Sequence, residues 1–249
     1  WIFPFIGFIF ISVGLALGFL QFRFSRYDMT EKRAGIAMCG FGNFTVLPLT
    51  LLEMFPLTAP AIAERFGTDT PVLYIGSMVV IMSPMLWSVG YALVTGSTRN
   101  LRISNIINPP IIAILLGFLT LLTGVNEFLT RETSFVFHVF SGLKSIGSVT
   151  FPLMLISIGA MIAEIELRTE GRRRLIGMAA RVVLVRFFIF PAISFFSYMT
   201  FLRHIDFFTP AHIWVLFLEA HIPPANNIPI MARRAGLNEA HSAFTTLVT

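Results

Sequence analysis

The chain has 249 residues, of which 55% are hydrophobic and only 12% are Asp, Glu, Lys or Arg, and its mean hydropathy is +0.80. Soluble domains carry about 25% charged residues, so the composition excludes a soluble globular protein and predicts a polytopic membrane protein. The net charge of +5 does not indicate nucleic-acid binding, because the basic residues fall mostly in loops between apolar segments. A single cysteine excludes an internal disulfide framework.

Apolar segments long enough to cross a bilayer, which takes about 20 residues, follow one another along the chain. The predicted spans are Trp1–Phe22, Ala34–Leu52, Pro71–Gly96, Ile103–Gly124, Ser145–Ala163, Arg181–Leu202 and Ala211–Ala232. A further segment begins at Ala243. The chain starts at Trp1 rather than at Met and ends at Thr249 within an apolar run, so we expect residues 1–249 to be a fragment of one membrane domain.

Basic residues alternate between the loops in the way that a membrane topology requires. The loops around Arg26, Arg99, Arg172 and Arg233 hold twelve Lys and Arg, whereas the other loops hold four. This second count includes Lys144, which is assigned to the loop before Ser145. The positive-inside rule therefore places the first set of loops in the cytoplasm.

Two of the predicted spans contain residues that interrupt a helix. Ala34–Leu52 carries a cluster of glycines followed by Pro48, and Ala211–Ala232 carries the pair Pro223-Pro224. Proline removes a backbone donor and clashes with the preceding turn. Inside a membrane such a break is tolerated only where protein or a water-filled cavity satisfies the freed backbone groups. The pattern predicts two discontinuous helices built around a binding site, as in secondary transporters.

The loop alternation makes the two broken segments run through the membrane in opposite directions. A proline-containing span, a charged loop and a broken span occur near the start of the chain and recur near its end. We therefore predict two inverted repeats, within residues 1–98 and 103–249, with a site near the midplane.

The motifs at these breaks resemble those of the auxin efflux carrier superfamily, which includes plant auxin carriers, PIN-like proteins and bacterial malonate-type permeases. The resemblance rests on the segments Gly42-Asn43-Phe44-Thr45-Val46-Leu47-Pro48-Leu49, Asn108-Pro109-Pro110, Pro152 to Gly159, and Pro223-Pro224-Ala225-Asn226-Asn227.

This resemblance implies an all-α, ten-helix, inverted-repeat fold similar to that of sodium/proton antiporters and bile-acid symporters. The chain would lack roughly the first two helices and most of the last. It also implies a secondary active transporter of a small organic anion, auxin-like or a dicarboxylate, working by an elevator-type movement. Its partners would be the lipid bilayer, a coupled proton or sodium ion, and a second copy in a homodimer. The protein would lie in the plasma (inner) membrane, or in the endoplasmic reticulum membrane if it is a eukaryotic PIN-like member.

Residues at the two breaks are the candidates for the site. Half-helix N-termini and neutral amides bind a carboxylate without burying a permanent charge. The predicted substrate-binding residues are Asn43, Thr45, Pro48, Pro223, Pro224, Asn226 and Asn227. In the alternative interpretation the asparagines only cap or bridge the broken helices.

Three ionisable residues in or near these spans need separate explanations. Glu219 and His221 precede the second break and are the candidates for carrying a coupled proton, although a packed histidine is an equal alternative. Arg186 is expected to snorkel to the cytoplasmic interface or to pair with an acidic residue.

Two other functions remain to be weighed. A cation/proton antiporter on the same fold would use Glu219 as its proton carrier, but the asparagines at the crossing disfavour it. The sequence contains no Ser-His-Asp grouping, no paired metal-ligand spacing and no glycine-rich nucleotide loop, so we expect neither an enzyme nor a cofactor or metal.

Overall fold

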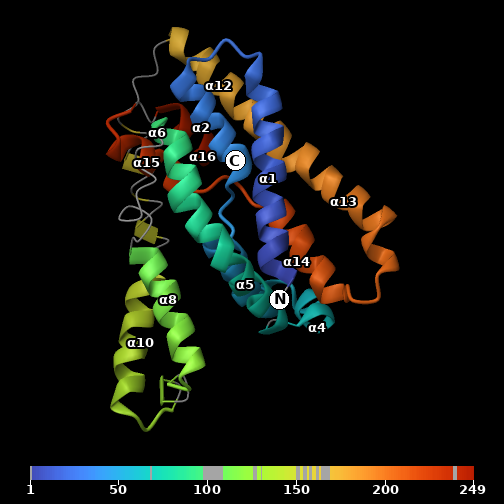
Figure 1. Ribbon diagram of the computed structural model, residues 1–249, viewed down its shortest axis with the longest axis vertical. Coiled ribbons are helices and arrows are strands. Elements are labelled where there is room, and N and C mark those ends of the chain that lie inside the picture. Colours follow the sequence, from blue (N-terminus) through green and yellow to red (C-terminus); the bar gives the residue numbers. More distant parts are fainter. Residues whose placement is uncertain are drawn as a thin grey trace.

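The structure is a computed structural model and describes residues 2–67, 69–97, 109–125, 128–129, 131–149, 152–153, 156, 159–160, 163, 169–237 and 240–249. All regular secondary structure in these ranges is helical (Figure 1). In the first half the helices are α1 (Ile2–Arg23), α2 (Met29–Gly40), α3 (Val46–Thr58), α4 (Pro60–Phe66), α5 (Asp69–Met85), the π-helix η1 (Leu86–Gly90) and α6 (Tyr91–Thr95). They are followed by α8 (Pro109–Leu122), α10 (Phe135–Ser148), α12 (Thr169–Val183), the π-helix η3 (Leu184–Ile189), α13 (Phe190–Thr200), the short 3₁₀ helix η4 (Leu202–His204), α14 (Pro210–Ala220), α15 (Asn227–Arg234) and α16 (Ala240–Val248).

Three continuous helices in the described ranges are long and apolar enough to cross a membrane. They run over Ile2–Arg23, Asp69–Thr95 and Arg173–His204, and they correspond to the first, third and sixth predicted spans. The second and seventh predicted spans are each divided into two shorter helices, as predicted. The helical class and the presence of helices able to cross a membrane are therefore confirmed.

The sequence prediction was wrong at two helix boundaries. The helix predicted to start at Arg181 starts at Thr169, because the basic run before it continues the helix instead of forming a loop; arginine is a good helix former. The start predicted at Ser145 falls inside α10, so Lys144 lies within a helix. The described residues later in that predicted span are helical, as predicted: Pro152, Leu153, Ile156, Gly159, Ala160 and Ala163. Most of the predicted range after Ser148, and the first part of Ile103–Gly124, lie outside the described residues.

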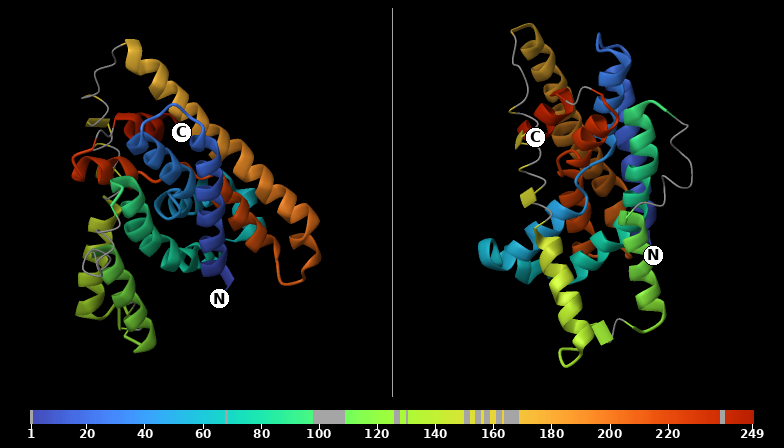
Figure 2. Two further views of the ribbon diagram at one scale, coloured as in Figure 1. Left: turned by 45° about the horizontal axis from the view of Figure 1, so that its top comes forward. Right: turned by 90° about the vertical axis from the view of Figure 1, so that its left-hand side faces the viewer.

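Two of the long helices are continuous although they contain proline. The π-helix η1 follows Pro84, and η3 precedes Pro191. A proline cannot donate to the preceding turn, and a π-turn is a common way for a helix to absorb such a local disturbance. Figure 2 shows α12, η3 and α13 as one long helix, coloured orange.

Helices α1 and α2 pack closely because glycines line their contact. A Cβ atom added to Gly14 would lie 2.6 Å from the carbonyl oxygen of Cys39, and one added to Gly18 would lie 2.8 Å from the Cys39 Cβ. Real Cβ atoms do not approach other atoms this closely. The two helices therefore touch backbone to backbone, and Cys39 fills the space between them as a fully buried residue.

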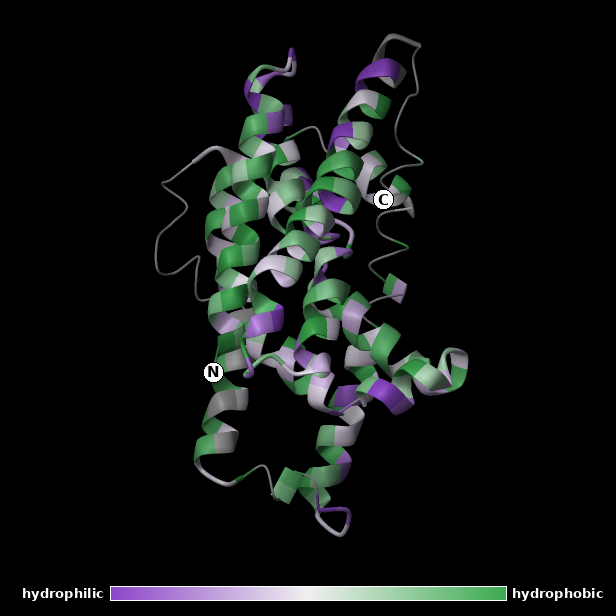
Figure 3. Ribbon diagram, turned by 90° about the vertical axis from the view of Figure 1, so that its right-hand side faces the viewer, coloured by the Kyte–Doolittle hydropathy of each residue, from purple (hydrophilic) through white to green (hydrophobic). Residues whose placement is uncertain are grey.

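The charged loops gather at two opposite ends of the helices. At one end Tyr27, after α1, donates to the carbonyl oxygen of Arg174, and Glu31 pairs with the Arg174 guanidinium at 2.9 Å. Arg65 and Arg203 line one cavity at the other end. Figure 3 shows hydrophobic residues along the lengths of the helices and hydrophilic residues near their ends. This arrangement agrees with the loop alternation in the sequence.

Candidate functional site

The first break separates α2 from α3. Asp28 caps the N-terminus of α2 in a capping box with Glu31, and the helix ends at Gly40, where the chain becomes extended. After five intervening residues α3 begins at Val46, with Pro48 as its third residue. Proline is tolerated in a first turn because the N–H groups there have no intrahelical acceptor. The sequence therefore ends one helix and starts the next within a few residues.

The second break has the same construction. Helix α14 ends at Ala220, Pro223-Pro224 hold the chain extended, and α15 starts at Asn227 with Pro229 as its third residue. Both restarted helices thus carry proline at the same position of their first turn. This parallel supports the predicted relation between the two halves of the chain, although the repeat boundaries themselves stay a prediction.

The two extended segments lie side by side and pair as a short antiparallel bridge between Gly42 and Pro224. The Asn43 N–H donates to the carbonyl oxygen of Pro223 at 2.8 Å, and the Ala225 N–H donates to that of Phe41 at 2.9 Å. Each break thereby satisfies backbone groups that the other leaves open. The predicted crossing of the two broken helices is present in the structure.

A cavity of about 280 Å³ lies at this crossing. Its lining combines the starts of α3 and α15 with residues of α5 and η1. The lining residues are Phe41, Gly42, Asn43, Phe44, Thr45, Val46, Met82, Ser83, Leu86, Trp87, Ala225, Asn226 and Asn227. None of these is charged, so the cavity presents amides and hydroxyls on one part of its wall and aromatic and aliphatic side chains on the rest.

The polar groups of this wall are available to a ligand. Within the described part of the chain, the side-chain amides of Asn43, Asn226 and Asn227 make no hydrogen bond. The backbone N–H groups of Val46 and Asn227, which begin α3 and α15, also find no acceptor there. A helix N-terminus carries a partial positive charge of about half a unit. Two such ends and three amides therefore meet at one cavity.

The structure brings together four of the seven predicted binding residues and separates the other three. Asn43, Thr45, Asn226 and Asn227 line the cavity. Pro48 is buried inside the first turn of α3 and does not line it. Pro223 and Pro224 form the bridge instead, so in this structure they shape the crossing and are absent from the cavity wall.

Arg186 lies directly behind the cavity and is completely buried, so the prediction that it snorkels to the interface was wrong. Its Nε and Nη2 donate to the carbonyl oxygen of Ile222 at 3.0 and 2.5 Å, and its Nη1 donates to that of Cys39 at 3.3 Å. These carbonyls lie at the C-terminal ends of α14 and α2. Each such end carries about half a negative charge, so one guanidinium balances both.

Gly42 and Phe44 form the wall between this cation and the cavity. The Arg186 Cζ lies 5.3 Å from the centre of the Phe44 ring, and a Cβ atom added to Gly42 would contact Nη2 of Arg186. Glycine is therefore required at position 42 for the guanidinium to reach both helix ends. The positive charge lies one residue layer away from the cavity.

The two candidates for proton coupling occupy different environments, and neither lines the cavity. Glu219, in the last turn of α14, is completely buried, and among the described residues neither of its carboxyl oxygens has a hydrogen-bond partner. Arg186 is the charged group that acts on it electrostatically. His221 is exposed and its Nδ1 lies 2.7 Å from the carbonyl oxygen of Phe217. In the described residues, no group of three or more His, Cys, Asp and Glu could hold a metal ion.

Comparison with known proteins places the whole chain in one family. A family model described as membrane transport protein matches residues 1–106 and again residues 95–249. The chain belongs to this family. The family expected from the motifs at the two breaks is thereby confirmed.

An uncharacterized transporter of Schizosaccharomyces pombe is 25% identical to the chain over 148 residues. This alignment covers 55% of the chain and 32% of the yeast protein, so the chain spans about a third of the length of that relative. No solved structure matches the chain significantly.

Sequence reasoning missed the part of the cavity that comes from α5 and η1. Met82, Ser83, Leu86 and Trp87 line it, but they lie in an apolar span with no polar cluster. The one sequence signal near these four residues is Pro84, which precedes the π-helix η1. The position of Arg186 within a predicted span is evident from the sequence. The residues next to it do not indicate that it binds the carbonyl groups of Cys39 and Ile222.

Proposed function

We propose that this membrane transport protein is a secondary transporter that binds the carboxylate of a small organic anion at the crossing of its two broken helices. The observation that carries the proposal is the cavity wall, where three amides that make no hydrogen bond to any described residue meet the N-termini of α3 and α15. Amide and helix N–H groups are donors suited to a carboxylate. The apolar part of the wall suits the organic portion of the ligand.

The charges around the cavity support an anion over a cation. No carboxylate lines the described wall, whereas Arg186 lies one layer behind it. A cation/proton antiporter needs an acidic group at the crossing, and Glu219 does not line the cavity. We therefore favour an organic-anion transporter over a cation/proton antiporter.

The direct test is uptake of carboxylates into proteoliposomes that contain Asn43→Ala or Asn226→Ala. A hydrogen bond to a charged group contributes about 1.5–3 kcal/mol, so each variant should take up substrate about 10- to 100-fold more slowly at low substrate concentration. The substrates are malonate, malate and indole-acetate, each compared with its uncharged amide. Thr200→Ala is the control, because Thr200 is exposed and its hydroxyl bonds only within its own helix.

Uptake at the native rate by both asparagine variants would contradict the proposal. Transport of the uncharged amides at the same rate as the carboxylates would contradict it too. Thermal unfolding of each variant should match that of Thr200→Ala, which separates a loss of binding from a loss of folding. The alternative role of the asparagines, capping or bridging of the broken helices, predicts the opposite pattern: lower thermal stability with unchanged affinity.

Glu219 is the better of the two candidates for coupling a proton to transport. It is buried beside Arg186 at the end of α14 and lacks partners for both carboxyl oxygens, whereas His221 is exposed and bonded within its own helix. In Glu219→Gln, uptake driven by the substrate gradient should persist and its acceleration by an imposed pH gradient should disappear. Acceleration that survives the substitution would exclude Glu219 as the coupling group.

The same proposal includes how the protein moves during transport and how its copies assemble. An elevator-type displacement would carry the crossing, with its bound anion, across the membrane against the remaining helices. A homodimer, a coupled sodium ion in place of the proton, and a location in the plasma or endoplasmic reticulum membrane come from the resemblance in sequence.

A further inference from the structure

A second cavity, distinct from the crossing, lies at the end of the molecule where α1 leads into α2. Its volume is about 410 Å³, within the range of about 300–1,000 Å³ that small-molecule sites occupy. Four arginines line it, and they come from two distant parts of the chain: Arg26 from the loop after α1, and Arg173, Arg174 and Arg181 from α12. We call this cavity the basic pocket.

The positive charge of the basic pocket is only partly compensated. Glu31 pairs with Arg174 at 2.9 Å, and Arg181 donates to the carbonyl oxygen of Gln21 at 3.3 Å. Arg26 and Arg173 are both exposed, and within the described part of the chain neither makes an ion pair or a hydrogen bond. Like charges held together without a counter-ion raise the affinity of a concave site for an anion.

An aromatic side chain holds the arginines in place. The Tyr27 ring lies between the two segments, with the Cζ atoms of Arg174 and Arg181 at 5.9 and 6.0 Å from its centre. Its hydroxyl donates to the Arg174 carbonyl oxygen at 3.1 Å. Burial raises the pKa of Tyr27, so the phenol stays neutral and adds no negative charge to the pocket. The cluster is thus fixed by contacts between α12 and the loop after α1.

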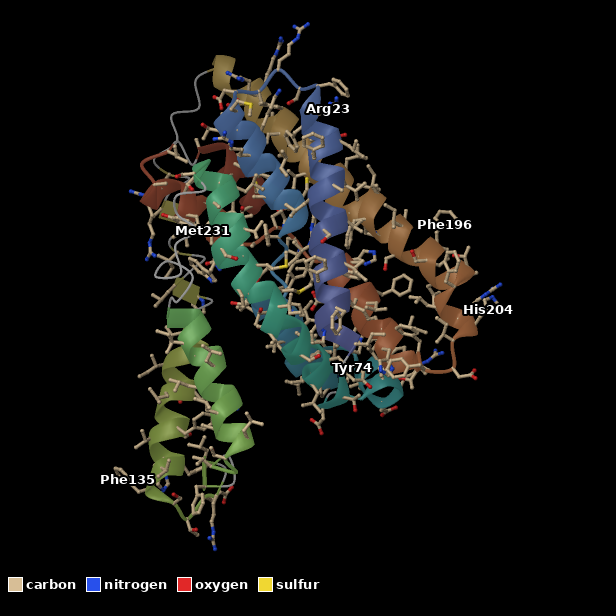
Figure 4. The ribbon with its side chains drawn as sticks, in the orientation of Figure 1. Arg23, Tyr74, Phe135, Phe196, His204 and Met231 are labelled. Carbon is tan, nitrogen blue, oxygen red and sulfur yellow. The ribbon has the colours of Figure 1, made fainter. Side chains whose placement is uncertain are left out.

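The position of the basic pocket suits a lipid headgroup. It lies where the helices Ile2–Arg23 and Arg173–His204 both leave their apolar stretches, which is the level of the headgroups in a bilayer. Phe24 lines the pocket and is 84% exposed, so an apolar surface adjoins the arginines. Figure 4 shows Arg23 at this end of the ribbon and His204 at the other. The loop charges assign this end to the cytoplasm.

We propose that the basic pocket binds the phosphate of an anionic phospholipid headgroup at the cytoplasmic surface, with Arg26 and Arg173 as its unpaired contacts. The arginines bind the phosphate, and Phe24 contacts the acyl chains that continue into the bilayer. This site is independent of the transported substrate. Basic residues near a membrane surface each contribute about 5-fold in affinity for anionic lipid, so loss of both arginines weakens binding about 25-fold.

The test uses the whole protein in detergent, titrated with phosphatidylglycerol or with phosphatidylcholine while thermal unfolding is followed. The variant Arg26→Gln/Arg173→Gln is compared with Arg65→Gln/Arg203→Gln, which removes the same charge from a cavity of about 420 Å³ at the opposite end. Phosphatidylglycerol should stabilise the native protein and the control at the same lipid concentration. The Arg26/Arg173 variant should need about 25-fold more.

Three results would overturn this assignment. The first is equal stabilisation by phosphatidylcholine, which would show that the headgroup charge is not recognised. The second is an unchanged titration midpoint in Arg26→Gln/Arg173→Gln, which would place the lipid elsewhere. The third is full stabilisation by inorganic phosphate alone, which would make the pocket a site for free phosphate. Native mass spectrometry of the same samples counts the bound lipid directly.

Discussion

Arg186 provides the sharpest test of how the crossing is held together. Arg186→Met keeps an apolar stem of similar length but removes the guanidinium. The carbonyl oxygens of Cys39 and Ile222 then lose the donors that they have in the structure. A buried acceptor without a partner costs about 1–3 kcal/mol, so the two together cost about 2–6 kcal/mol. The dipole ends of α2 and α14 also lose their counter-charge.

This loss is large against a typical folding free energy of about 5–15 kcal/mol. For a chain of this size each kcal/mol lowers the unfolding temperature by about 2–4 °C, so Arg186→Met should unfold about 4–24 °C below the native protein. Thermal unfolding in detergent measures the shift. Arg203→Met is the control because Arg203 is exposed, and it should change little. Arg186→Lys should fall between the two, since one ammonium lacks the fork that reaches both carbonyls.

The reasoning would be refuted by an Arg186→Met protein that unfolds within about 1 °C of the native one. That result would mean that removing the cost of burying a cation outweighs the lost hydrogen bonds, as has been found for some buried ion pairs. Uptake measured in parallel shows whether the cation behind the cavity contributes to substrate binding independently of stability.

Further predictions concern the glycine at the crossing and a half-buried histidine. Gly42→Ala should displace the Arg186 guanidinium, abolish uptake and lower the unfolding temperature. Gly76→Ala is the control and should change neither uptake nor unfolding temperature, because a Cβ atom added there meets no atom within 4 Å. Uptake and thermal unfolding are measured for both variants. Burial lowers the pKa of His241 below its usual 6.5, with Glu31 opposing the shift and Arg174 adding to it. The unfolded chain therefore binds the proton more strongly, so thermal stability should be full above about pH 6.5 and fall as the pH drops below it. His241→Gln should flatten this dependence, and an unchanged slope between pH 5.5 and 7.5 would contradict it.

The sequence predicted those features that depend on local chemistry. Pro223-Pro224 removes two adjacent backbone donors, and the glycines before Asn43 together with Pro48 weaken a helix there, so both breaks were predictable from residue type. The asparagines lined the cavity as expected, because polar groups at a membrane break need a polar environment. The helix starting at Thr169 was missed because an arginine run is compatible both with a loop and with an exposed helix.

Features that depend on contacts between distant segments could not be predicted in this way. Arg186 bonds to carbonyl groups 36 and 147 residues away, and backbone carbonyls have no signature in a sequence. The partners of Asn43 and Ala225 in the bridge are likewise backbone groups. The contribution of Trp87 to the cavity depends on how α5 and η1 pack against the crossing, which local propensity does not determine.

The glycine contact between α1 and α2 limits how the crossing can move. Helices separated by side chains can slide past one another as rotamers change, but at Gly14 and Gly18 the backbones touch and leave no side chain to rearrange. Shear along this seam would force Cys39 or Gly40 into the facing backbone. Any displacement that exposes the cavity to the two sides of a membrane in turn must therefore carry α1 with it as one rigid body. Spin labels placed on α1 and α2 should keep a constant separation throughout the transport cycle.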